Sequence, residues 1–202
     1  MFSLSRWSGG LVDRFGPRLP LTIGPVLAAV GFALFALPSI NARYWTGFLP
    51  AVVVLGLGMA LAVAPLTTTV MGSVSSEQSG VASGINNAVS RAAGLIAIAV
   101  FGVVMLYSFR ESLSLRMTAI GVNEEVRKSI EDQSVRLGGL EVPQNLDPSS
   151  RRAVEDAVGR SFVSGFRVVM IISALLALAS ATSALILIGR SSRVPRGVRR
   201  RT

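Results

Sequence analysis

The stretch Gly9-Gly10-Leu11-Val12-Asp13-Arg14-Phe15-Gly16-Pro17-Arg18 leads directly into the uncharged apolar segment Leu19–Ile40. Gly16 permits a tight turn, and the proline that follows it fixes the backbone angle φ. An apolar segment of this length would hold the charges of the turn at a membrane surface. A charged, glycine-bearing turn that leads directly into a membrane helix is unusual.

Four segments of the chain are long and apolar enough to cross a bilayer, which takes about 20 mostly apolar residues in a helix. They are Leu19–Ile40, Trp45–Met71, Val81–Tyr107 and Val168–Gly189. The third carries one charge, Arg91, and the other three carry none. The mean hydropathy of +0.58 is too high for a soluble domain of this size. The predicted fold class is all-α, with four transmembrane helices.

The basic residues predict the orientation of these helices. Six arginines lie in the last thirteen residues, directly after the fourth segment. A basic run in this place is typical of a cytoplasmic anchor beside anionic lipid, so the net charge of +9 does not imply nucleic acid as a partner. Four spans put both termini on one side, so we predict that both are cytoplasmic and that the protein is multi-pass in the cell membrane.

The chain then divides into five parts by composition. Residues 1–18 hold the end of a preceding helix and a cytoplasmic loop, and residues 19–107 hold three transmembrane helices. An extracytoplasmic helical loop is expected over residues 108–165, the final transmembrane helix over 166–189, and a basic cytoplasmic tail over 190–202.

The loop of residues 108–165 is expected to form a helical hairpin. Asn123 and the two glutamates after it are typical of a helix start, and an apolar stripe predicts a helix over Asn123–Leu137. Gly138-Gly139 would stop it. Asp147-Pro148 predicts a second helix that runs into the last span. The hairpin could act as a lid or partner site, or it could be a packed connector.

Small residues inside the spans predict close helix packing. Gly56 and Gly58 lie in the second segment, and Pro65 predicts a kink because it cannot donate to the carbonyl four residues earlier. In the third segment Gly80, Gly84 and Gly94 are predicted packing positions.

The third segment is also the most polar. Asn86, Asn87 and Arg91 lie about one leaflet from its cytoplasmic end, and a charge there is costly unless it faces a cavity or a partner. We predict these three residues as cavity-lining or gating candidates. The alternative is a structural role, with Arg91 bonded to backbone carbonyls or reaching the interface.

The composition argues against enzyme chemistry. The chain has no cysteine and no histidine, and no nucleophile–base pair, carboxylate dyad or metal cluster occurs, so no cofactor or metal is expected. The four apolar segments contain no aspartate or glutamate. A carboxylate that couples transport to protons would therefore have to lie elsewhere.

The stretch at residues 9–18 resembles the cytoplasmic loop motif of major facilitator superfamily transporters, G-x-L-x-D-R-x-G-x-R/K. The matching residues are Gly9, Asp13, Arg14, Gly16 and Arg18. The later order of Pro65, Ser79-Gly80-Val81-Ala82-Ser83-Gly84 and Arg91 is similar to the C-terminal third of 14-helix drug/proton antiporters. Pro17 departs from the pattern, because many members have a basic residue there.

The resemblance implies part of a C-terminal bundle in a secondary active transporter that exports small molecules or drugs with proton coupling. Its partners would be the lipid bilayer, a small-molecule substrate and the missing N-terminal helices. The motif would be a gating latch, with Asp13 facing the N-terminal bundle. The alternative is a stand-alone four-span protein that acts as an interaction partner or modulator.

Overall fold

The computed structural model describes residues 18–40, 42–72, 74–143 and 146–188, with only the backbone of Ala64, and every regular element in this part is helical. The elements are α2 (Arg18–Phe35), the π-helix η1 (Tyr44–Phe48), α3 (Leu49–Gly72), the 3₁₀ helix η2 (Ser76–Gln78), α4 (Ser79–Ile120), α5 (Glu124–Asp132), the 3₁₀ segment η3 (Ser134–Gly139) and α6 (Pro148–Leu187). Within the described residues, four helical stretches are long and apolar enough to cross a membrane. The predicted all-α membrane fold is therefore confirmed.

Helices α2 and α3 form an antiparallel pair that is packed backbone to backbone. A Cβ atom on Gly24 would lie 2.8 Å from the Cβ of Ala62, and one on Gly58 would lie 2.5 Å from the backbone nitrogen of Ala28. Farther along, a Cβ on Gly31 would lie 2.7 Å from that of Leu55. Glycines let the two backbones approach this closely.

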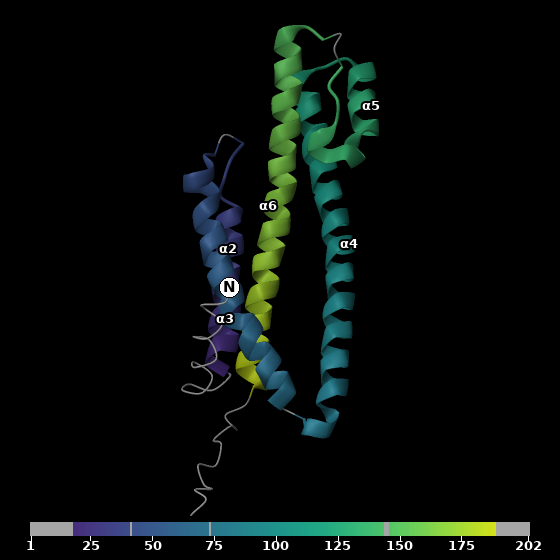
Figure 1. Cartoon of the computed structure of the whole chain (residues 1–202). Coiled ribbons are helices and arrows are strands. Elements are labelled where there is room, and N and C mark those ends of the chain that lie inside the picture. The colour runs from purple at the N-terminus through teal and green to yellow at the C-terminus, as the bar shows by residue number, and fades with distance from the viewer. Residues whose placement is uncertain (1–17, 41, 73, 144–145, 189–202) are drawn as a thin grey trace, which may run out of the picture.

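Helices α4 and α6 both continue well beyond the apolar segments, and Figure 1 shows them side by side at one end of the molecule with α5 against them. We call this end, residues 109–143 and 146–162, the head. Its core is made of buried apolar side chains from α4, α5, α6 and the segment after η3: Phe109, Leu113, Met117, Ile130, Leu140, Val154 and Val158. Away from the head, α4 diverges from α6 toward Ser79 (Figure 1).

The head confirms both predicted helix starts. The Asn123 side chain accepts a hydrogen bond from the Glu125 backbone nitrogen, and the Asp147 side chain accepts from the backbone nitrogens of Ser149 and Ser150. The helix that begins at Pro148 continues without a break to Leu187, as expected.

The predicted helix over Asn123–Leu137 is too long. It ends at Asp132, and a 3₁₀ segment follows in which Leu137 takes a positive φ of 52°. Gln133 follows the helix, and its side chain accepts from the Glu141 backbone nitrogen at 3.2 Å and donates to the Glu141 carbonyl at 3.4 Å. These two bonds bridge the segment that contains Gly138-Gly139, so they stabilise a turn where the prediction had the helix continue.

Candidate functional site

Of the five predicted motif residues, the structure describes Arg18. It opens α2, and its Nη2 donates a hydrogen bond to the Leu185 carbonyl at 2.7 Å, in the last turn of α6. The last carbonyls of a helix lack intrahelical partners and carry partial negative charge, so a guanidinium there is stabilising. Among the described residues, Arg18 thus binds a helix end. Gly9, Asp13, Arg14 and Gly16 lie outside the described residues.

Arg167 of α6 makes a similar contact with the carboxyl end of α2. Its Nη2 donates to the Pro38 carbonyl at 3.2 Å and lies 3.5 Å from the Leu37 carbonyl, just after α2 ends. Helices α2 and α6 run antiparallel, and each therefore supplies one arginine to the carboxyl end of the other. The sequence analysis missed Arg167, although a single arginine directly before the apolar segment at Val168 is a usable signal.

The predicted packing residues of α3 differ in their surroundings. Gly58 lies against α2, with no room for a Cβ atom, whereas a Cβ on Gly56 would have no described neighbour within 4 Å. Pro65 is buried inside α3, and the hydroxyls of Thr68 and Thr69 donate to its carbonyl at 3.0 and 2.7 Å. The kink at Pro65 stays a prediction.

The predicted residues of α4 lie together on an open part of that helix. A Cβ atom added to Gly80, Gly84 or Gly94 would have no described neighbour within 4 Å, and the residues around these glycines are mostly exposed. Asn86 is half-buried, whereas Asn87 and Arg91 are exposed, and Arg91 forms no hydrogen bond or ion pair with a described residue. Asn87 and Arg91 are one helical turn apart, so they share a face.

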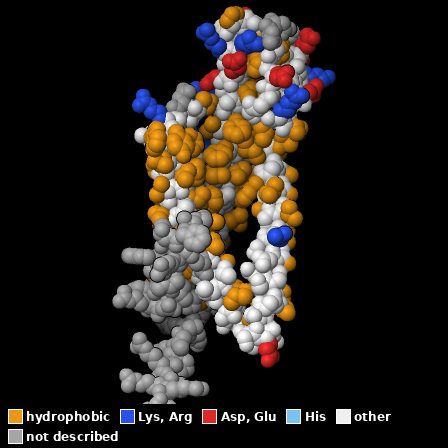
Figure 2. Space-filling model, viewed as in Figure 1, with side chains coloured by type: hydrophobic (Ala, Val, Ile, Leu, Met, Phe, Trp, Pro, Cys, Tyr) orange, Lys and Arg blue, Asp and Glu red, His pale blue; other side chains and the backbone are white. Residues whose placement is uncertain are grey.

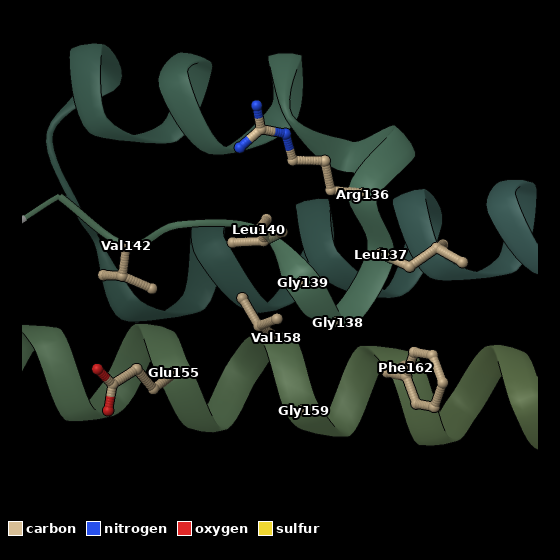
Figure 3. Close-up of a pocket in the computed structure, with 10 residues that line it drawn as sticks. All are labelled: Arg136, Leu137, Gly138, Gly139, Leu140, Val142, Glu155, Val158, Gly159 and Phe162. Atoms are coloured by element: carbon tan, nitrogen blue, oxygen red, sulfur yellow. The ribbon is translucent and has the colours of Figure 1, made fainter.

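A cavity of about 690 Å³ lies in the head between η3 and α6, and the sequence analysis did not anticipate it. In Figure 3, Val158 and Phe162 project from α6 toward Gly138 and Gly139, whereas the Arg136 guanidinium points away from α6. The two charged residues of the lining are paired. Arg136 lies 3.5 Å from Glu141, and Glu155 lies 3.7 Å from Arg151.

Phe162 connects this cavity to a smaller apolar one of about 170 Å³ where the head meets the end of α2. Phe35, Phe48 and Phe166 also line the smaller cavity, and the rings of Phe35 and Phe48 are 6.4 Å apart. This face of α6 can take an apolar group. In the part of the chain that the structure describes, no cluster of His, Cys, Asp or Glu could hold a metal ion.

Comparisons with known proteins agree with this arrangement. The model of the family described as Major Facilitator Superfamily matches residues 1–110. The tetracenomycin C resistance and export protein of Streptomyces glaucescens is 27% identical over 184 residues, which is 88% of this chain and 33% of that protein. Methyl viologen resistance protein SmvA of Salmonella typhimurium is 27% identical over 157 residues, which is 77% of this chain and 30% of that protein.

A third relative is the multidrug resistance protein Stp of Mycobacterium tuberculosis, which is 25% identical over 178 residues, covering 82% of this chain and 31% of that protein. The chain therefore spans about a third of the length of the curated relatives it matches. No solved structure matches the chain significantly.

Proposed function

The chain belongs to the major facilitator superfamily, and from this premise we propose that it is the C-terminal part of a proton-coupled exporter of small molecules. The observation that carries the proposal is the family match over residues 1–110, which covers the loop motif and α2, α3 and most of α4. The printed names of the three relatives, which concern resistance and export, support a drug-like substrate.

The exposed part of α4 supports the proposal that further helices of the transporter pack against it. Its glycines, with Asn86, Asn87 and Arg91, offer small and polar positions that no described helix covers. In a bilayer such positions are expected to face protein or a water-filled cavity rather than lipid. We place the absent N-terminal helices against this surface, with the substrate path between the two halves and alternating access as the mechanism.

The charged residues near the two termini support the proposed orientation in the membrane and the proposed gating role of the motif. The basic residues at both ends of the sequence favour cytoplasmic termini in the cell membrane, which puts the head outside. In the motif, Asp13 would meet a helix N-terminus of the absent bundle in one state, while Arg18 holds α2 to α6 within its own half. The apolar segments contain no carboxylate, so the proton-carrying group belongs to the absent helices.

The test is efflux of methyl viologen by the complete transporter, expressed in a host without its own exporters for that compound. We expect Asp13→Asn to insert normally and to slow efflux about fivefold or more, because a latch of a few kcal/mol would be lost. Arg43→Gln is the matched control, since Arg43 is an exposed residue in the connection between α2 and α3. A protonophore should abolish efflux.

Two outcomes would contradict the proposal. Full efflux by the Asp13→Asn variant would contradict the proposed latch role of Asp13. Efflux that persists with a protonophore would contradict proton coupling. The same assay tests Arg91→Ala, which should change the rate or the range of exported compounds. A change in thermal stability alone would assign Arg91 a structural role. A stoichiometric complex of the 202-residue chain with an unrelated membrane protein would favour the stand-alone alternative.

A further inference from the structure

A third cavity, of about 200 Å³, lies where the head meets the end of α2, and its lining is strongly basic. Arg116 reaches it from α4, Arg160 and Arg167 reach it from α6, and Ser39 and Ser164 add hydroxyl groups. We propose that this cavity binds the phosphate group of an anionic lipid headgroup. The site is separate from the gating motif and from the exposed part of α4.

The charge balance of the cavity favours an anion. None of its lining residues is acidic. The carboxylate in contact with its arginines, among the described residues, is Asp156, which accepts from the Arg160 Nε at 2.6 Å. Three guanidinium groups against one carboxylate leave two positive charges uncompensated.

The donors left over are suited to phosphate oxygens. Arg116 directs its Nε to the Ser112 hydroxyl at 3.3 Å, which leaves its terminal nitrogens without a hydrogen-bond partner in the described chain. The Nη2 of Arg167 is engaged with the Pro38 carbonyl, but its Nε is buried and has no hydrogen-bond partner in the described chain. Guanidinium groups match phosphate with paired N–H donors, and hydrogen bonds to a charged acceptor are the stronger kind.

The position of the cavity favours a lipid over a dissolved anion. Ser39 is followed within six residues by Tyr44 and Trp45, which are 57% and 73% exposed, with their rings in edge-to-face contact at 5.8 Å. Exposed Tyr and Trp mark the level of the lipid headgroups in membrane proteins. Figure 2 shows the same boundary, with charged side chains gathered over the head and hydrophobic side chains below it.

The experiment is native mass spectrometry of the full chain in micelles, with phosphatidylglycerol, phosphatidylcholine or inorganic phosphate added. We expect retention of phosphatidylglycerol in clear preference to phosphatidylcholine. The double variant Arg116→Gln/Arg160→Gln should retain it at least about tenfold less, because two charge-assisted contacts are lost. The control Arg127→Gln/Arg136→Gln loses the same charge from the same head, outside the cavity, and should bind as the unchanged chain does.

Equal retention of the two lipids, or equal loss in the two double variants, would overturn the proposal. Binding of inorganic phosphate that matches phosphatidylglycerol, and that is lost in the cavity variant, would keep the phosphate chemistry and overturn the lipid source. Hydrogen exchange on the unchanged chain gives a result even if a variant misfolds. Phosphatidylglycerol should protect peptides that contain residues 36–40, 112–120 and 160–167, which line the cavity, and protection only outside these stretches, or none, would contradict the site.

Discussion

The Arg18 guanidinium donates to the Leu185 carbonyl at 2.7 Å, which joins the first residue of α2 to the last turn of α6 across 167 positions of sequence. Arg167 reaches the Pro38 carbonyl at the opposite end of the same pair. Helix α2 is thus tied to α6 near both of its own ends by one kind of contact, a cation on the carbonyls at a helix end. A pair held in this way is expected to move as one body.

Arg18→Ala should cost about 1 kcal/mol of stability, because it removes one charge-assisted hydrogen bond at a partly exposed helix end. Hydrogen exchange at residues 185–188 should rise, since the last turn of α6 loses its partner. Arg43→Ala, in an exposed position, serves as the control. The contact at Leu185 would be unimportant if exchange in the last turn stayed the same.

The double variant Arg18→Ala/Arg167→Ala tests whether the two ends act independently. The contacts are separated by the length of α2, about 27 Å at 1.5 Å per residue, so their effects should add within about 0.5 kcal/mol. Thermal unfolding in micelles of the single and double variants measures this. A loss of stability in the double variant that clearly exceeds the sum of the two single losses would mean that the two contacts are coupled.

Gly58 and Gly56 offer a matched pair for the packing of α3. Gly58→Ala should destabilise the α2–α3 pair by about 1–3 kcal/mol, because the new methyl would meet the backbone of Ala28 and Gly24 at 2.5 and 2.8 Å. Gly56→Ala adds the same methyl where no described neighbour lies within 4 Å, and it should be neutral or slightly stabilising. Thermal unfolding of the two variants checks this, and equal losses would rule out the close contact as the cause.

Ile130 tests the core of the head. It is fully buried against side chains from α4 and α6, so Ile130→Ala should cost about 2–5 kcal/mol in the stability of the head. Proteolysis between residues 121 and 147 should become faster as α5 loosens. The control is Ser129→Ala, one residue away on an exposed position. Unchanged cleavage would show that α5 is held by other contacts.

Asp147 predicts a pH dependence at the start of α6. Hydrogen bonds from Ser149 and Ser150 hold the pKa of this carboxyl well below its ordinary range. A lowered pKa means that the cap stabilises the helix above about pH 4 and that this contribution fades as the pH falls further. The amide NMR signals of Ser149 and Ser150 should report the change.

The variant Asp147→Asn separates capping from charge. Asparagine caps helices about as well as aspartate but does not titrate in this range, so the variant should keep the helix start and lose its acid sensitivity. If the same shift with pH appeared in the variant, another group would be the cause.

The positions of the membrane helices could be predicted from apolar runs, and two helix starts could be predicted from Asn123 and Asp147. The continuation of α4 past Tyr107 was not predicted, because charged residues interrupt the apolar run there. A signal was nevertheless present: Phe109, Leu113 and Met117 recur every fourth residue and form the buried stripe of the head.

Other features depend on contacts that local sequence does not specify. Gly24 and Gly31 of α2 lie against Ala62 and Leu55 of α3 because α2 and α3 pack antiparallel. The turn after α5 is bridged by Gln133, whose partner Glu141 lies eight residues away. The candidate residues Asn87 and Arg91 of α4 lie on a surface that no described helix covers, so their partners are specified by contacts outside the described structure.

Because α4 and α6 continue from the apolar region into the head without a break, we expect the head to follow any tilt of these two helices. The part of α4 from Phe109 to Ile120 extends about 18 Å at 1.5 Å per residue. A tilt of about 10° below the head would swing its far end by about 3 Å over that length. A spectroscopic label on the far turn of α4 would therefore read the angle of that helix in the bilayer from the water outside.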